Sequence, residues 1–289
     1  MREVSPKMHA YFDGLNKQVL ESYEIANKAK SKGYDPEDHV DIPLAKNMAE
    51  RVEGLIRVAA PAIVGSGMVE RITELESEYG KLDWRVAFTI ALEVAQQKFC
   101  KFKEELEAME VGIRAGIAYL TIGAVASPLE GFTELKLVDR RDGKGKYFAL
   151  LFSGPIRSAG GTASAASVIL SDYVRKKMGY AEYDPTSEEI KRQSTEIVDY
   201  HERITNLQYF PSQEEVEFLT EKMPVQITGE PSERLEVSNY KDLPRVETNN
   251  IRNGVCLVVG EGIAQKAPKL WKQLDKWGKD FDLGHWKFL

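Results

Sequence analysis

A glycine-rich segment at residues 154–162, with the sequence GPIRSAGGT, stands between two strongly patterned stretches. The apolar run at 147–152 before it predicts a buried strand. The small and apolar residues after it, which end in three cations and Gly179, predict a helix. Cations favour the last turn of a helix, and glycine suits the left-handed residue that closes it. The chain must therefore pass from a strand into a helix through residues that carry little side-chain bulk.

This glycine junction permits two interpretations. Backbone N–H groups and the positive end of a helix dipole together favour an anion. Small residues fit tight packing between a helix and a sheet equally well. The segment has neither the Gly-Lys-Ser/Thr of a Walker loop nor GxGxxG spacing, which excludes those two nucleotide sites. The candidates for phosphate contact here are Arg157, Ser158, Gly160, Gly161 and Thr162.

Composition limits the class of protein. The 289 residues are 43% hydrophobic and 29% charged, which is typical of a soluble globular protein, and no apolar run of membrane-spanning length occurs. The N-terminus lacks the pattern of a signal peptide, and the isolated Cys100 and Cys256 are expected to be reduced core thiols of a cytoplasmic protein. The four histidines are scattered and no CxxC pair exists, so we predict no metal site. A net charge of −6 means that any contact with nucleic acid must be local.

Before residue 125 the apolar residues recur at three- and four-residue steps, which predicts helices. The expected helices are a first one with a core-facing stripe from Met8 to Ala26 that ends at Gly33, a second opened by Pro43, a third that stops at Gly80, a fourth capped by Asp83, and a fifth from about Glu104. Gly112 and Gly116 in the fifth helix indicate close helix–helix packing, because they lower helix propensity without serving as caps.

After residue 125 the pattern changes. Residues 133–138 and 146–152 flank an Asp-Gly turn and predict a β-hairpin. Capping boxes at Thr186/Glu189 and Ser212/Glu215 open two further helices. Short strands are expected at 224–228 and 254–260, and a last helix from about 262 to 277. The predicted fold class is mainly α with a small β component (α+β), comprising a helical region at 1–125 and a mixed α/β region at 126–289.

The last predicted helix is strongly amphipathic. Successive residues rotate by roughly 100°, which places Lys266, Lys269, Lys272, Lys276 and Lys279 within an arc of roughly 140°. Tryptophan and leucine occupy the opposite side. A lysine stripe is commonly a solvated face. In an acidic chain it is also the best local candidate for contact with a phosphate backbone.

The whole chain resembles the N-terminal part of the large subunit of the archaeal family-D DNA polymerase. The segments that carry the resemblance are DWRVA at 83–87, IRAGIAYLT at 113–121, SPLEGF at 127–132, GPIRSAGGT at 154–162, QYFPS at 208–212, LPRVETN at 243–249 and EGIAQKAPK at 261–269. Many long matches in the same order are far more specific than one short motif.

The resemblance implies a piece of a DNA-directed DNA polymerase, a nucleotidyltransferase of DNA replication. In that family the catalytic carboxylates and the zinc-binding cysteines lie outside the matching region. This piece is therefore expected to be inactive alone, with no catalytic residue, metal or cofactor of its own, whereas the rest of the subunit holds divalent metal and zinc. The implied partners are DNA, the rest of the large subunit and the exonuclease-bearing small subunit. The sliding clamp and a second large subunit are further implied partners, and no membrane contact is expected.

We therefore expect a module for subunit assembly and for positioning DNA without reading its sequence. Its phosphate contacts would come from the glycine junction, from Arg252 and from Lys266, Lys269, Lys272 and Lys276. Two alternatives stay open. One is a purely structural interface that never meets DNA. The other is a small-molecule-kinase-like phosphate loop, which the junction resembles only loosely.

Overall fold

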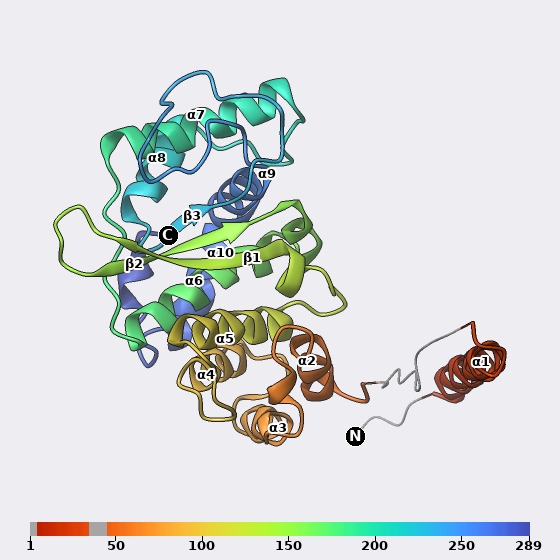
Figure 1. Cartoon of the computed structure of the whole chain (residues 1–289). Coiled ribbons are helices and arrows are strands. Elements are labelled where there is room, and N and C mark those ends of the chain that lie inside the picture. The colour runs from red at the N-terminus through yellow and green to blue at the C-terminus, as the bar shows by residue number, and fades with distance from the viewer. Residues whose placement is uncertain (1–4, 35–44) are drawn as a thin grey trace. The chain divides into compact units, whose positions relative to one another are not determined.

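The computed structural model of the chain describes residues 5–34 and 45–289 (Figure 1). Its contacts divide the chain into two units, residues 1–46 and residues 47–289. In the first unit the described structure is the helix α1 (Pro6–Lys30). The second unit contains the helices α2 (Met48–Ile56), α3 (Met68–Tyr79), α4 (Trp84–Ala95), α5 (Glu105–Leu120), α6 (Gly161–Lys177), α7 (Ser187–Arg203), α8 (Gln213–Lys222), α9 (Asn253–Cys256) and α10 (Gln265–Trp277). Its strands are β1 (Phe132–Asp139), β2 (Lys146–Phe152) and β3 (Gln226–Thr228).

Short helical turns join these elements. Three are 3₁₀ turns: η1 (Pro61–Ile63), η3 (Gly154–Ala159) and η5 (Gly284–Phe288). Two are π-helical: η2 (Ser127–Gly131) and η4 (Leu257–Ala264). The strands form one sheet in the order β1-β2-β3, with β1 antiparallel and β3 parallel to β2. The predicted hairpin is confirmed, and so is the α+β class.

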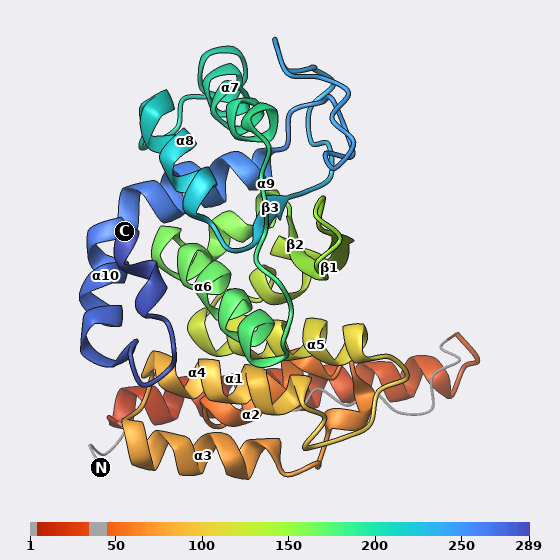
Figure 2. The same cartoon turned by 90° about the vertical axis from the view of Figure 1, so that its left-hand side faces the viewer.

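Helix α6 lies at the centre of the second unit. Every residue from Ser164 to Arg175 is buried, since α6 contacts β2, α4, α5, η4 and α10 (Figure 2). One cluster of buried apolar side chains runs from Ala49 to Trp286, so residues on both sides of position 125 share a core. The domain boundary expected near residue 125 stays a prediction. Small residues in the first turns of α6 allow these neighbours to approach its backbone closely.

Most of the expected helices are present. Helix α3 ends before Gly80, and the side chain of Asp83 caps α4 by accepting a hydrogen bond from the Arg85 N–H. Both capping boxes form at the starts of α7 and α8. The opening of the second helix at Pro43 lies outside the described residues, within which α2 begins at Met48.

The expected first helix is present as α1, and what its apolar stripe faces stays a prediction. One expectation is wrong. The apolar run at 254–260 is helical, comprising most of α9 and the start of η4. All residues from Gly254 to Ala264 are buried, so the segment has no polar face to mark a helical period. A short apolar run with no polar face does not distinguish a strand from a buried helix.

Candidate nucleic-acid interface

The glycine junction turns the chain through η3 between β2 and α6. Gly160 has φ +73°, in the left-handed region that glycine adopts without strain, and space around its Cα is open. Gly161 and Thr162 are the first two residues of α6, so their N–H groups have no acceptor one helical turn earlier. The amide of Gly160 itself donates to the Arg157 carbonyl oxygen. The junction thus leaves the amides of Gly161 and Thr162 at the positive end of the helix dipole.

Gly161 also has a packing role. A Cβ atom on this residue would overlap the carbonyl oxygen of Glu261 in η4. Glycine is needed here because the backbone of η4 lies against the start of α6. Packing and an exposed helix N-terminus therefore occur at the same junction, through different residues. The space beside the Gly161 Cα is occupied by η4, whereas the space beside the Gly160 Cα is open.

The lysine-bearing face of α10 meets this junction. The Lys269 ammonium lies 3.2 Å from the Thr162 hydroxyl oxygen, across 107 residues of sequence. Beside them is a hollow of about 250 Å³ that opens on the surface. It is lined by Trp84, Leu120, Ala159, Gly160, Gly161, Thr162, Ala163 and Lys266. Trp84 and Leu120 make one wall apolar. The other wall consists of the backbone at the N-terminus of α6 and the cation of Lys266, and no carboxylate is among the lining residues.

A second, smaller hollow of about 150 Å³ shares Gly160 and Gly161 with the first. Its wall includes the half-exposed side chain of Arg157, whose guanidinium lies 3.9 Å from a Glu261 carboxylate oxygen. The same Glu261 oxygen accepts a hydrogen bond of 2.9 Å from the Gln208 N–H. The two hollows together connect Arg157 to Lys266 across the glycine junction.

Beyond the hollows, the other lysines continue along α10 and just past its end at Trp277. Leu270, Leu274 and Trp277 are buried on one side of the helix, whereas Lys269, Lys272, Lys276 and Lys279 are exposed. Near the end of this row stands Asp83. Burial opposes ionisation of Asp83, but its hydrogen bonds with Arg85 outweigh that effect, and with a smaller contribution from Lys276 they lower its pKa. Lys276 therefore has a nearby carboxylate, although that carboxylate is already paired with Arg85.

The structure places two candidates differently from the rest. Ser158 is exposed, but its hydroxyl is engaged with the Pro155 carbonyl and the Ser127 hydroxyl. Arg252 is 3% exposed and forms a bidentate ion pair with the buried Glu196, so it is not accessible to a phosphate. Burial opposes the charge of Arg252, but Glu196 raises its pKa. Arg252 is therefore removed from the candidates, and its role is to hold Glu196 in the core.

No sequence pattern indicates that Trp84 and Leu120 form the apolar wall of the larger hollow. Each occupies an ordinary position in a predicted helix. Both are distant in sequence from residue 160, so no local pattern indicates that they share a hollow with it. The partial exposure of Trp84 at the first turn of α4 is visible only in the structure.

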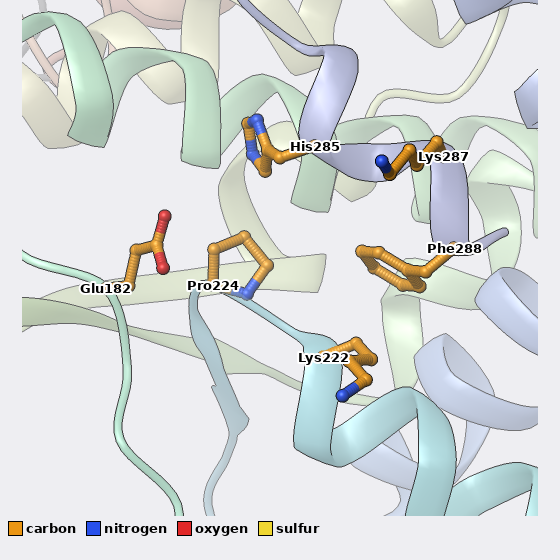
Figure 3. A pocket seen from close by; sticks show the side chains of 6 residues that line it. All are labelled: Glu182, Lys222, Pro224, His285, Lys287 and Phe288. Atoms are coloured by element: carbon orange, nitrogen blue, oxygen red, sulfur yellow. The ribbon is translucent and has the colours of Figure 1, made fainter.

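A third hollow, of about 500 Å³, contains none of the candidates. Glu182, Lys222, Pro224, His285, Lys287 and Phe288 line it (Figure 3). Within residues 5–34 and 45–289, no three acidic, histidine or cysteine side chains gather as metal ligands would. No helix in this part of the chain is long and apolar enough to cross a membrane.

Residues 10–289 match the family described as DNA polymerase II large subunit DP2, N-terminal. The DNA polymerase II large subunit of Nanoarchaeum equitans is 50% identical over 279 residues, which cover 96% of this chain and 22% of that protein. The protein of the same name from Methanothermobacter thermautotrophicus is 44% identical over 284 residues, covering 98% of this chain and 25% of its own length. That from Archaeoglobus fulgidus is 44% identical over 272 residues, covering 94% and 22%. The chain thus spans a quarter or less of these relatives.

Proposed function

The chain belongs to the family of DNA polymerase II large subunits, to whose N-terminal part it corresponds, and we propose that it holds DNA by the phosphate backbone. The observation that carries this proposal is the contact between Lys269 and Thr162. It brings a row of lysines and the start of a long helix onto one surface. Both are features that attract phosphate, through ammonium groups and through unbonded N–H groups at a helix N-terminus.

The spacing of the lysines supports a backbone contact. With a rise of about 1.5 Å per residue, lysines three or four residues apart stand roughly 4.5–6 Å from one another along the axis of α10. Flexible ammonium groups at this spacing can follow successive phosphates of one strand. They carry no rigid fork for a base edge, so the binding is expected to be independent of sequence.

Reversal of three lysines tests the proposal. In the variant Lys269→Glu/Lys272→Glu/Lys276→Glu, affinity for duplex and primer–template DNA should fall at least tenfold at low salt, measured by fluorescence anisotropy. The matched control reverses Lys103, Lys144 and Lys191, which are exposed, lie outside α10 and line neither hollow. It makes the same change in net charge and should retain most of the affinity.

Equal losses in the two variants would reduce the effect to net charge and contradict a local site. Unchanged affinity in the α10 variant would favour the alternative, in which this face of α10 is a protein interface. Two DNAs of unrelated sequence and equal length should bind alike, because a backbone contact carries no sequence information.

We also propose that this part supports synthesis without performing it. Phosphoryl transfer requires carboxylates that hold divalent metal, and these are assigned here to the remainder of the subunit, together with zinc. The relatives are named as large subunits, so the rest of the subunit is the expected partner. The resemblance to the family-D polymerase adds a small subunit with exonuclease activity as a further expected partner. Primer extension by the 289-residue chain alone, with Mg²⁺ and deoxynucleotides, should be absent. Extension above a heat-inactivated control would overturn this assignment.

A further inference from the structure

An exposed aromatic ring stands at the edge of the same surface. Phe210 lies parallel to the ring of His201, with centroids 4.1 Å apart and planes at 6°. The Phe210 residue is nevertheless 43% exposed. The imidazole covers one face of the phenyl ring, so a second flat partner would stack on the other face. We call this ring the stacking platform.

This platform is fixed in place on both sides. The His201 Nδ1 accepts a hydrogen bond of 3.0 Å from the Leu207 N–H, which holds the start of the loop. After the ring, Pro211 is buried, and the Tyr209 hydroxyl donates to Glu215 over 3.0 Å. A ring held this way loses little conformational entropy when a flat partner stacks on it.

The platform adjoins the phosphate-binding candidates. Gln208, two residues before Phe210, lines the smaller hollow together with Arg157, Gly160 and Gly161. The Gln208 N–H and the Arg157 guanidinium both approach the Glu261 carboxylate, at 2.9 Å and 3.9 Å. From there the larger hollow leads to Lys266, and Lys269 follows on α10. Phe210 thus follows two residues after a wall of the hollow that holds Arg157 and the two glycines, and the lysines lie beyond that hollow.

We propose that this surface takes single-stranded DNA, with an unpaired base stacked on Phe210 and the backbone following Arg157, the glycine junction and the α10 lysines. The inference rests on the proposed function and specifies its substrate. A combination of aromatic faces and a basic groove is the arrangement that recognises single strands without sequence preference. In a duplex the faces of the bases are covered by their neighbours, so Phe210 would have nothing to stack on.

Hydrogen bonds fix two carboxylates near this path without removing their negative charge. Glu215 accepts hydrogen bonds from Tyr209 and from the N–H of Ser212, and Glu261 accepts one from Gln208 and faces Arg157. Both are thus engaged within the protein. A phosphate that approached Arg157 would compete with Glu261 for the guanidinium, over a separation at which that ion pair is weak.

The test compares one strand with two. Fluorescence anisotropy of the 289-residue chain is measured with an oligothymidylate of about 20 nucleotides and with a duplex of the same length, at one salt concentration. Phe210→Ala should weaken single-strand binding by roughly 5- to 150-fold, the range for loss of one stacked base. Duplex binding should change by less than twofold. Phe210→Trp should retain single-strand binding, and the fluorescence of the new tryptophan should be quenched by the oligonucleotide.

The matched control is Phe218→Ala on α8. Phe218 is a phenylalanine of similar exposure, 45%, that packs edge-on to Phe288 and lines neither hollow of the surface. It should leave both affinities unchanged. Equal effects of Phe210→Ala on single strand and duplex, or none on either, would overturn the proposal. If Phe210→Ala changes neither affinity but reversal of the α10 lysines still lowers DNA affinity, the contact with the DNA backbone stands and only the stacking is absent. No response to either variant would refute both.

Discussion

Gly112 in α5 lies so close to α4 that a side chain there would overlap the Ala91 carbonyl oxygen and stand 3.0 Å from the Ala95 nitrogen. Gly112→Ala must therefore push the two helices apart, and it should destabilise the chain by about 1–3 kcal/mol. Gly54 in α2 has nothing within 4 Å of the corresponding position. Gly54→Ala should stabilise by about 0.5–1 kcal/mol, because alanine has the better helix propensity.

Urea unfolding followed by circular dichroism measures both changes as shifts in the midpoint at constant slope. Shifts in opposite directions are expected. A Gly112→Ala variant as stable as the parent chain would mean that the α4–α5 contact relaxes at little cost, and that the close packing predicted from the sequence is not what stabilises it.

Asp172 in α6 is a fully buried carboxylate with three partners. It lies 2.6 Å from the His285 Nε2, 2.7 Å from the Arg175 guanidinium and 2.8 Å from the Trp286 indole nitrogen. Burial disfavours the ionised form, but the hydrogen bond with His285, the charge of Arg175 and the indole N–H outweigh it and lower the Asp172 pKa. This stabilisation is thus complete above the unfolded-state pKa of about 3.9, and it is lost as the pH falls through the lower folded-state pKa.

Asp172→Asn should therefore be less stable than the parent chain at neutral pH, since asparagine cannot form the ion pairs. Its stability should also fall less steeply between about pH 5 and pH 3, because the group that titrates is gone. Urea midpoints at several pH values give the two slopes. Parallel curves would show that Asp172 does not contribute to acid unfolding.

At the scale of elements, the sequence predicted best what neighbouring residues determine. The capping boxes at Thr186 and Ser212 use partners three residues away, and the Asp-Gly turn sets its own hairpin. The prediction of a strand at 254–260 was wrong, because a completely buried helix shows no alternation of apolar and polar residues at the helical period. The three- and four-residue spacing of apolar residues correctly predicted the helix α1, because a helical period is set by residues close in sequence.

Arg252 shows the same limit for a site residue. Its sequence neighbours suggested an accessible cation, whereas Glu196 on α7, 56 residues earlier, holds it in the core at the start of α9. Arg252→Met should cost about 3–5 kcal/mol, because it leaves the Glu196 charge buried with only the weaker Arg192 contact. Arg252→Met/Glu196→Leu should recover only part of that loss, because Arg192 is then buried without its carboxylate partner and keeps only contacts with carbonyl oxygens. Urea unfolding measures both losses. Equal stability of the single and double variants would mean that an unpaired Arg192 costs as much as an unpaired Glu196.

At the scale of the whole molecule, the candidate surface comes from parts of the chain that are distant in sequence. Trp84, the glycine junction and α10 supply one hollow, and Arg157 and Gln208 supply the next. From the sequence, each of these parts can be identified separately as a cation, a glycine turn or an aromatic residue of the core. Their meeting depends on the burial of α6 between its neighbours, which no local pattern encodes. The phosphate candidates could therefore be named from the sequence, while their assembly and the apolar wall could not.

The net charge of −6 adds a constraint at this scale. Most of the surface repels DNA, so binding must come from the few cations gathered here and should depend steeply on salt. If Arg157, Lys266, Lys269, Lys272 and Lys276 each neutralise one phosphate of a duplex, the slope of log affinity against log salt should be about −4.5, since each contact contributes about 0.9. Raising the salt from 50 to 200 mM should then weaken binding roughly 500-fold. Reversal of Lys269, Lys272 and Lys276 should bring the slope to about −2, whereas reversal of Lys103, Lys144 and Lys191 should leave it at about −4.5. Anisotropy titrations over this salt range measure all three slopes. A parent slope near zero would place the binding energy in contacts other than phosphates, and a slope that the α10 variant does not reduce would place the phosphates elsewhere on the molecule.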